Sequence, residues 1–422
     1  MQTAYYAQRR YTILNMLRHL APLSRKVLAD LTDFRPSTVS ELCKDLIEEG
    51  LLVEAGHYSV GHGRRRILLE INHEHLCALG IAFSSLQVTF IVTQFNGTIL
   101  QRENLSFSPD LSRDELAEQI IAQVKALTEQ FPERKIVGAG IGEPLYGPAY
   151  YSGDDTAYES FTGWIRSELK PRLEQAVPFS VSCFNAVTLP ALVEQRFGAA
   201  RGCENFFCVE LSNGIGCSIC CNGKVVAGSS GTAGELGHTV IDAADTGDRP
   251  CYCGKFGCVE RTSAFPAIAA EITSALEHGV YSTLNSFYDR SRPLRAQDIR
   301  RALDEGDQLC RRIVKRAAHR IGTAIANSVT LLNPELVVLY GFMLELGSYF
   351  LQELTTAIRE NVFVLSKNFE IRVSSTLETE LPLGAAAEMF AQFLHAEEFA
   401  WIYRIDPEIT NDKTESDEDD SE

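Results

Sequence analysis

The stretch CYCGKFGC at residues 251–258 places three thiols within eight residues, and the stretch GELGH at residues 234–238 ends thirteen residues before its first cysteine. Two glycines inside the first stretch free the backbone to curl the cysteines around one point. Three thiolates and one imidazole fill the tetrahedral shell of a structural zinc ion and leave no open position for catalysis. The spacing therefore predicts a structural Zn²⁺ held by His238, Cys251, Cys253 and Cys258.

The remaining cysteines are expected to behave differently. The chain has twelve cysteines, and in a chain without signs of secretion thiols bind metal or stay free rather than form disulfides. Cysteines in apolar surroundings act as small buried hydrophobes. This is the expectation for Cys77, Cys208, Cys217, Cys220 and Cys310.

Strand and helix patterns alternate on both sides of the cysteine stretch, over residues 76–400. Strands are expected at residues 76–83, 88–93, 136–141, 206–211, 216–221 and 336–339. Helices are expected at residues 113–131, 188–197, 264–277 and 384–393, and as a pair within residues 296–332. Such alternation is typical of an α/β fold.

Residues 1–70 carry a different pattern, of three helices followed by a hairpin. The helices are expected at residues 13–20 and 25–31, with Ser24 as a cap, and from Pro36 or Ser37 to Gly50. Strands are expected to start at residue 51 and to cover residues 67–69, and a glycine- and histidine-rich turn is expected over residues 56–63.

This order of elements is the layout of a winged helix-turn-helix. Protein–protein modules can have the same elements, but three adjacent arginines on a glycine turn favour contact with phosphates or a minor groove. We expect residues 37–48 to be the recognition helix in the major groove. The expected DNA contacts are Arg35, Ser37, Thr38, Ser40 and Lys44 from the helix, and Arg64, Arg65 and Arg66 from the wing.

The charge of the chain is unevenly distributed. The net charge is −17, but residues 1–70 hold ten Lys and Arg against eight Asp and Glu. Residues 406–422 hold nine acids and one lysine, and we expect them to form a disordered acidic tail. Because the local field governs contact with phosphates, an acidic protein can still carry a DNA-binding surface.

The composition is that of a soluble globular protein, with 45% hydrophobic and 23% charged residues. No apolar run approaches the ~20 residues that span a bilayer. The N-terminal residues MQTAYYAQRRYTILNML lack the apolar core and small-residue cleavage site of a secretory signal. The expectation is a cytoplasmic protein without a membrane partner.

The two glycine-containing stretches together resemble the signature of the ROK family, which groups sugar-responsive repressors with sugar kinases. Further matches are SNGIG at 212–216, CNGK at 221–224, LNPE at 332–335 and LGAAA at 383–387. The resemblance covers about residues 76–400, and an added N-terminal helix-turn-helix is what the repressor branch carries. The wing GHGRRR at 61–66 is similar to the family's GRGRP-like wing, with departures at His62 and Arg66.

The resemblance implies an α/β chain in which the winged helix-turn-helix, residues 1–70, precedes a two-lobed actin/hexokinase-like (ribonuclease H-like) sensor domain. Residues 76–186 with 384–400 would form the small lobe. Residues 187–383 would form the large lobe with the zinc site, and a sugar would lie in the cleft. The family also implies zinc at the four residues already chosen on chemical grounds.

The residues that the family's kinases need are replaced. Phosphoryl transfer requires a phosphate-cradling turn, a metal handle and a base for the substrate hydroxyl. The family's Gly-x-Asp-x-Gly-Gly-Thr turn reads GIAFSSL at 80–86, so Ala82, Ser84, Ser85 and Leu86 stand at its functional positions. Ala186 replaces the catalytic aspartate, and Tyr340 stands where a nucleotide-binding glycine is expected. We therefore expect no enzyme activity.

The family's sugar contacts are partly preserved, at Asn185, Glu235, His238 and Glu260. Buried amides and carboxylates hydrogen-bond sugar hydroxyls and discriminate between them. His238 can bind zinc through one ring nitrogen and face the pocket with the other. In the alternative interpretation, the two glutamates only hold the zinc loop. Because Ala186 replaces the family's aspartate, the ligand can be a modified sugar, a phosphosugar or a protein partner.

These features lead to one hypothesis and two alternatives. The hypothesis is a homodimer, or a dimer of dimers, that reads a palindromic double-stranded DNA operator and responds to a sugar that changes the lobe arrangement. The first alternative is a sugar kinase with an atypical active site. The second is a ligand-independent regulator controlled by a protein partner.

Overall fold

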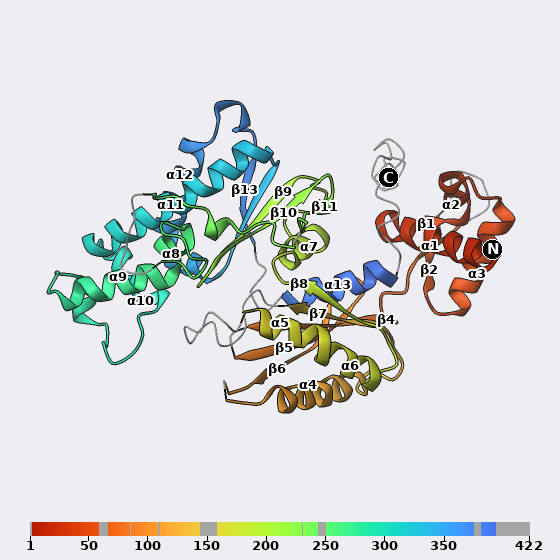
Figure 1. The fold of residues 1–422 in the computed structure, drawn as a ribbon. Helices are drawn as coiled ribbons and strands as arrows, with labels where there is room; N and C mark the ends of the chain where they lie inside the picture. The colour runs from red at the N-terminus through yellow and green to blue at the C-terminus, as the bar shows by residue number, and fades with distance from the viewer. Residues whose placement is uncertain are drawn as a thin grey trace, which may run out of the picture. The chain divides into compact units, whose positions relative to one another are not determined.

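The structure is a computed structural model that describes residues 2–58, 66–84, 86–108, 110–143, 158–229, 231–243, 250–374 and 381–393 (Figure 1). The chain divides into two compact units: Met1–His75 with Phe390–Glu422, and Leu76–Met389. Residues 1–70 therefore belong to the first unit. Both glycine-containing stretches, residues 234–238 and 251–258, belong to the second. Among the described helices, none has the length and apolar character needed to cross a membrane.

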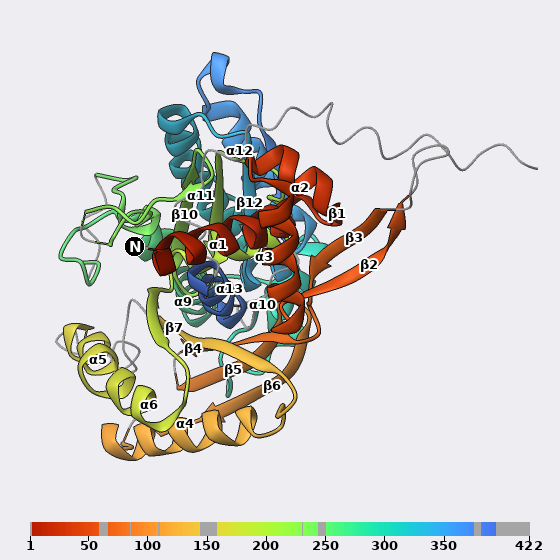
Figure 2. The same ribbon diagram turned by 90° about the vertical axis from the view of Figure 1, so that its right-hand side faces the viewer.

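The first unit contains the helices and hairpin that the sequence predicts (Figure 2). Its described helices are α1 (Gln2–Leu20), α2 (Arg25–Thr32) and α3 (Pro36–Glu48). Its described strands are β1 (Leu23–Ser24), β2 (Leu52–Tyr58) and β3 (Arg66–Ile71), in the spatial order β1-β3-β2. All pairings in this sheet are antiparallel.

Local chemistry explains where two of these helices begin. The side chain of Ser24 accepts a hydrogen bond from the backbone N–H of Val27 at 3.4 Å, which confirms the predicted cap of α2. Pro36 stands in the first turn of α3, where its missing N–H costs nothing. The buried side of α3 comprises Val39, Leu42, Cys43 and Leu46, and Ile47 beside them is half-buried.

Two predictions for the first unit are wrong in detail. The first helix begins at Gln2, well before residues 13–20, whose apolar spacing predicted it. Gly56 and His57 lie inside β2 and not in a turn, because β2 pairs with β3 as far as Tyr58 opposite Arg66. The register shifts between Glu54 and His57, where Gly56 has φ 113°, so the glycine provides an irregularity in the strand and not its end.

The second unit is built on two sheets, each with five strands in the described residues. The first sheet has the order β6-β5-β4-β7-β8 and comprises β4 (Leu76–Ser84), β5 (Gln87–Gln94), β6 (Ile99–Ser106), β7 (Lys135–Glu143) and β8 (Val181–Asn185). The second has the order β11-β10-β9-β12-β13 and comprises β9 (Phe206–Leu211), β10 (Ile215–Cys221), β11 (Lys224–Val225), β12 (Leu336–Tyr340) and β13 (Glu370–Val373).

The two sheets have the same topology. In each, the first three strands are antiparallel neighbours and the last two join in parallel on the other side of the first strand. The helical connections lie at different places: α4 (Arg113–Thr128) lies between the third and fourth strands of the first sheet, and α12 (Ser348–Asn361) lies between the fourth and fifth strands of the second. Each sheet with its helices is one lobe.

Most predicted elements of this unit are confirmed. The pair predicted within residues 296–332 consists of α10 (Ala296–Asp304) and α11 (Gln308–Leu332), and α7 (Leu189–Arg196), α9 (Phe265–Glu277) and α13 (Leu381–Phe393) also match. Elements that the sequence analysis did not predict are β6, β8, β11, β13, α12, the short α8 (Val259–Ser263), and α5 (Tyr158–Trp164) with α6 (Lys170–Ala176).

The first sheet contacts α13 through glycines. A Cβ added to Gly80 of β4 would lie 1.9 Å from the carbonyl oxygen of Pro382, and one added to Gly140 of β7 would lie 2.3 Å from that of Ala385. Both oxygens belong to the backbone of α13. Only residues without a side chain allow this approach, so the C-terminal helix is held against the strands that begin the first lobe.

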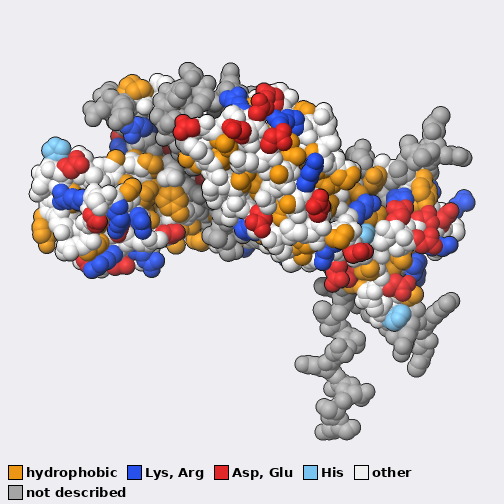
Figure 3. All heavy atoms as spheres, turned by 90° about the horizontal axis from the view of Figure 1, so that it is seen from below, with side chains coloured by type: hydrophobic (Ala, Val, Ile, Leu, Met, Phe, Trp, Pro, Cys, Tyr) orange, Lys and Arg blue, Asp and Glu red, His pale blue; other side chains and the backbone are white. Residues whose placement is uncertain are grey.

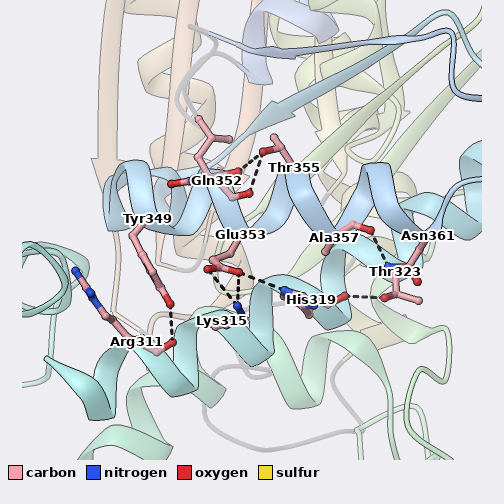
Figure 4. Close-up of polar contacts among 11 residues, drawn as sticks. Arg311, Lys315, His319, Thr323, Tyr349, Gln352, Glu353, Thr355, Ala357 and Asn361 are labelled. Carbon is pink, nitrogen blue, oxygen red and sulfur yellow. Dashed lines mark hydrogen bonds and ion pairs between the residues drawn. The ribbon is translucent and has the colours of Figure 1, made fainter. Parts of the chain in front are cut away.

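In the second lobe, α11 and α12 pack together with a polar seam along one side (Figure 4). The carboxylate of Glu353 accepts from Lys315 at 3.2 Å and from the ring of His319 at 3.3 Å, and the hydroxyl of Tyr349 donates to the carbonyl of Arg311 at 3.4 Å. Seen from below, the face of the first lobe on the side of α4 carries interspersed acidic and basic side chains (Figure 3).

Candidate functional site

The connection between β11 and α8 carries both glycine-containing stretches. Residues Leu236–His238 form a short 3-10 turn, and Cys258 pairs with Val240 through an isolated β-bridge just before α8 begins. Gly257 has φ 72°, and a Cβ there would lie 2.0 Å from the carbonyl oxygen of Asp242. This glycine therefore lets the cysteine loop fold back on the chain that leads from His238.

The four predicted metal ligands lie together. One ligand atom from each of His238, Cys251, Cys253 and Cys258 falls within 4.8 Å of all the others. The Sγ of Cys251 is 3.5 Å from Nδ1 of His238, and the Sγ atoms of Cys253 and Cys258 are 3.6 Å apart. Ligands about 2.3 Å from a tetrahedral zinc ion lie about 3.8 Å from one another. The cluster can therefore hold a metal ion of this size.

The electrostatics of the cluster suit a metal ligand set. Burial lowers the pKa of His238, with a further contribution from the ammonium of Lys255, so its ring is neutral and can coordinate a cation. Burial raises the pKa of Cys251 to about 12 when no metal is bound. Because a metal binds the thiolate, coordination at Cys251 displaces a proton.

The second ring nitrogen of His238 has a partner that the sequence analysis did not predict. Nε2 forms a short hydrogen bond with the hydroxyl of Tyr252, and the two rings meet edge to face with centroids 4.7 Å apart. The carboxylate of Glu235 lies 3.7 Å from the same nitrogen. Tyr252 was visible as the residue between two cysteines, but nothing in the sequence indicated where its side chain points.

Two carboxyl groups lie beside this histidine. Glu260 is mostly buried; its Oε2 accepts from the backbone N–H of Ile215 at 2.9 Å, and burial, helped by the charge of Glu235, raises its pKa to about 7. Burial also raises the pKa of Glu235. A Cβ on Gly214 would lie 2.9 Å from Oε2 of Glu260, so the glycine turn of β9 and β10 provides the space for this carboxyl group.

Asn185 reaches the second lobe from the end of β8. Its amide nitrogen donates to the carbonyl of Gly231, and its Oδ1 accepts from the N–H of Val187 at 2.9 Å. An amide has two N–H groups and two oxygen lone pairs, so one of each is still available after these bonds. Asn185 therefore links the first lobe to the segment that precedes Glu235 and keeps capacity for a ligand.

An ion pair between the buried Glu143 and the exposed Arg166, beside Asn185, was also missed. Glu143 ends β7 directly opposite Asn185 of β8, and its carboxylate is 3% exposed. Arg166 donates two hydrogen bonds to it, at 2.6 Å from Nε and 2.5 Å from the terminal nitrogen, from a single π-helical turn at Ile165–Leu169. No spacing rule connects residues 143 and 166, so only the fold brings them together.

The residues that stand at the family's kinase positions lie in ordinary strands and loops of the structure. Ala82 is buried in β4. This strand continues to Ser84, which pairs with Gln87 of β5, so Leu86 lies in the turn of an ordinary hairpin. Ser85 lies outside the described residues. Ala186 follows β8 and donates its N–H to the carbonyl of Glu143 at 3.0 Å. Tyr340 is buried, with its hydroxyl 3.5 Å from Glu210.

The predicted DNA-contacting residues of α3 lie mainly on its solvent side. Arg35 precedes the helix, and Arg35, Ser37, Ser40 and Lys44 are exposed, whereas Thr38 is half-buried on the flank. Ser40 donates to the carbonyl of Pro36 at 2.9 Å. In the predicted wing, Arg66 begins β3 and is half-buried, and Arg64 and Arg65 lie outside the described residues.

Comparison with known proteins agrees with this arrangement. A family profile described as ROK family matches residues 78–391. The chain is 27% identical over 383 residues to the xylose repressor of Caldicellulosiruptor bescii, covering 90% of this chain and 94% of that protein. It is 24% identical over 387 residues to the DNA-binding transcriptional dual regulator NagC of Escherichia coli, covering 89% and 90%. A glucokinase of Halalkalibacterium halodurans is 32% identical over 222 residues, or 51% of this chain and 64% of that one.

Solved structures support the fold. A ROK family transcriptional regulator, described as a homolog of the E. coli MLC protein, superposes with a TM-score of 0.76 at 19% identity and covers 94% of this chain and 99% of its own. The ROK hexokinase of Thermus thermophilus superposes with a TM-score of 0.59 at 22% identity and covers 75% and 99%. The predicted fold, an N-terminal winged helix-turn-helix with a two-lobed actin/hexokinase-like domain, is confirmed.

Proposed function

The chain belongs to the ROK family, and we propose that it is a DNA-binding transcriptional regulator, acting as a repressor of sugar metabolism or transport genes. The observation that carries this proposal is the extent of similarity. Matches to named repressors cover 89–90% of the chain and so extend into residues 1–70, whereas the glucokinase match covers only 51%. A protein with this role works in the cytoplasm, where the DNA is.

In this proposal, residues 1–70 bind the DNA operator as part of a homodimer or a dimer of dimers. The solvent side of α3 enters the major groove, where Arg35, Ser37, Ser40 and Lys44 are exposed for contact. Thr38, on the flank, contacts the backbone, and Arg64, Arg65 and Arg66 form the wing. Two subunits related by a two-fold axis would read a palindromic site.

The effector in this proposal is a sugar or phosphosugar bound by Asn185, Glu235, His238 and Glu260. The side chain of Asn185 comes from the small lobe, taken as residues 76–186 with 384–400, and the other three come from the large lobe, residues 187–383. A ligand that touches both groups favours one arrangement of the lobes, which is the requirement for changing DNA affinity.

We also propose that the cysteine cluster holds a structural Zn²⁺ ion. Three thiolates and one neutral imidazole prefer zinc and leave no site for a reacting water. The ion would fix the orientation of the His238 ring through Nδ1, and so determine where Nε2, Tyr252 and Glu235 meet. In this way the metal positions one wall of the effector site without taking part in chemistry.

We propose no kinase activity for this chain. Described positions that would supply the phosphate turn and the general base hold Ala82, Ser84 and Ala186, and Tyr340 fills the place of a glycine with a buried ring. An ATP-coupled assay over a panel of hexoses and amino sugars should show no turnover above background. Turnover that disappears in Asn185→Ala would instead establish the alternative, an atypical sugar kinase.

The decisive experiment is binding of the full-length protein to its own upstream DNA, with and without sugars and phosphosugars. We expect sequence-specific binding that weakens steeply with salt and that at least one sugar changes. Binding that no sugar changes would favour the ligand-independent regulator. The absence of specific binding under every condition would refute the proposed function.

A further inference from the structure

The exposed stripe of α3 contains an acidic residue at its centre. Positions 37, 41, 44 and 48 follow one another at helical spacing, on the side opposite the buried face of the helix. They hold Ser37, Glu41, Lys44 and Glu48, and all four are exposed. If α3 is the recognition helix, the surface that faces DNA therefore presents a carboxylate between a hydroxyl and an ammonium group.

Glu41 differs from the other acids of this helix and its C-cap. Asp45 accepts a hydrogen bond from the hydroxyl of Tyr6, and Glu49 pairs with Arg10, whose terminal nitrogen is 2.6 Å from Oε1. Glu48 lies 3.6 Å from the ammonium of Lys44. For Glu41, by contrast, the described part of the chain provides no hydrogen bond or ion pair.

An unpaired carboxylate at this place costs DNA affinity unless the DNA offers it a donor, because the phosphates repel it. In the major groove the base donors are the 4-amino group of cytosine and the 6-amino group of adenine. Adenine places its N7 acceptor beside the amino group, which disfavours a carboxylate, whereas the groove edge of cytosine carries the donor without an acceptor of its own.

We propose that Glu41 is a specificity-determining residue that accepts a hydrogen bond from the 4-amino group of a cytosine in each half-site. The inference rests on the proposed DNA-binding function and adds the base that α3 selects. Glu41 lies in the first half of the helix, which is the part of a recognition helix that contacts base edges. Glu48, seven residues further and about 10 Å along the axis, lies in the other half.

The test is a selection from duplexes with a randomised central segment, performed with the sugar-free full-length protein. The variants are Glu41→Gln, Glu41→Ala and, as a matched control, Glu48→Gln, which removes the same charge from the same stripe. Both positions are exposed, so folding of the three variants should be unaffected, and thermal unfolding checks this. Binding of individual selected sequences then gives the discrimination between bases at each position.

We expect the wild-type motif to require cytosine at one position of each half-site, with about tenfold discrimination against other bases. Glu41→Ala should lose that discrimination, and Glu41→Gln should shift it toward adenine, which glutamine recognises with a donor and an acceptor. Glu48→Gln should keep the wild-type motif. A cytosine preference retained within twofold in both Glu41 variants would overturn the inference and leave DNA binding intact. No wild-type motif at all would overturn both.

Discussion

The two sheets of the sensor domain share one strand order but differ in what connects their strands. In the first lobe, residues 107–134 link the third and fourth strands and contain the single described helix α4. In the second lobe the same link spans residues 226–335 and contains the His238, Cys251, Cys253 and Cys258 cluster, the carboxyl groups of Glu235 and Glu260, and α8 to α11. The two lobes therefore share the arrangement of their strands, and the long connection of residues 226–335 carries most of the candidate site residues.

The lobes also differ in how they bury their helices. In the first lobe, glycines in the strands allow the backbone of α13 to approach the sheet. In the second lobe, Gly322 of α11 allows the close approach of α12, because a Cβ added at Gly322 would lie 2.6 Å from the Cβ of Ala357. The first contact joins sheet to helix and the second joins helix to helix. Glycines therefore allow close packing in both lobes, between sheet and helix in the first and between two helices in the second.

The largest expected effect is in the insertion of the second lobe. Cys258→Ser should abolish binding of one equivalent of zinc and lower the free energy of unfolding by more than about 4 kcal/mol, because loss of a metal ligand removes the whole site. Metal analysis and thermal unfolding measure the two effects. Cys221→Ser is the control, since Cys221 ends β10 outside the cluster.

A chelator separates the metal from the mutation. Wild-type protein treated with a chelator should lose stability as Cys258→Ser does, and the variant itself should not respond to the treatment. Less than half an equivalent of zinc in the purified wild-type protein would contradict the assignment of a structural zinc.

The next effect concerns the backbone packing of the first lobe. Gly80→Ala should lower the free energy of unfolding by about 3 kcal/mol, because the added methyl group overlaps the carbonyl of Pro382 and forces β4 and α13 apart. Chemical denaturation measures the loss. In the same lobe, Gly163→Ala is the control: no atom lies within 4 Å of its Cβ, so the gain in helix propensity should stabilise α5 by about 0.5–1 kcal/mol. Equal effects of the two substitutions would argue against the glycine contact.

The smallest expected effect is at the edge of the first sheet. Arg166→Ala leaves the buried carboxylate of Glu143 without its two donors, but the side chain of Arg166 is itself 65% exposed, so we expect a loss of only about 1–2 kcal/mol. Because Glu143 lies opposite Asn185, the thermal shift produced by an effector sugar should also fall. Arg172→Ala removes pairs with the exposed Asp114 and Glu118 and should change neither quantity measurably.

Much of the fold follows from local sequence patterns. The strand at Phe206–Leu211 was predicted because it is a short, almost continuous apolar run. The helix pair of α10 and α11 was predicted because its apolar residues recur at helix spacing. The edge strand β6 was missed because it pairs with only one neighbour and presents polar residues on both faces. In α12, by contrast, Phe350, Leu354 and Ile358 recur every four residues, so its pattern was present and was overlooked.

The sequence by itself determined which four residues can act as metal ligands and which residues stand at the family's kinase positions. The ligands His238 and Cys251 to Cys258 are close along the chain, and the glycines between them restrict how that short segment can fold. The replacements at Ala82 and Ala186 are visible from residue type alone, because neither side chain can bind a metal or accept a proton.

Only the tertiary structure decided which side chains surround these residues. It placed Tyr252 on His238, Arg166 on Glu143 and the amide of Asn185 on the backbone of Gly231. It also left Glu41 without a partner among the described residues of its unit while Asp45 and Glu49 acquired theirs. The physical reason is that a hydrogen bond forms only where the backbone places a donor next to an acceptor. For segments that are distant in sequence, strand register and helix packing determine that placement.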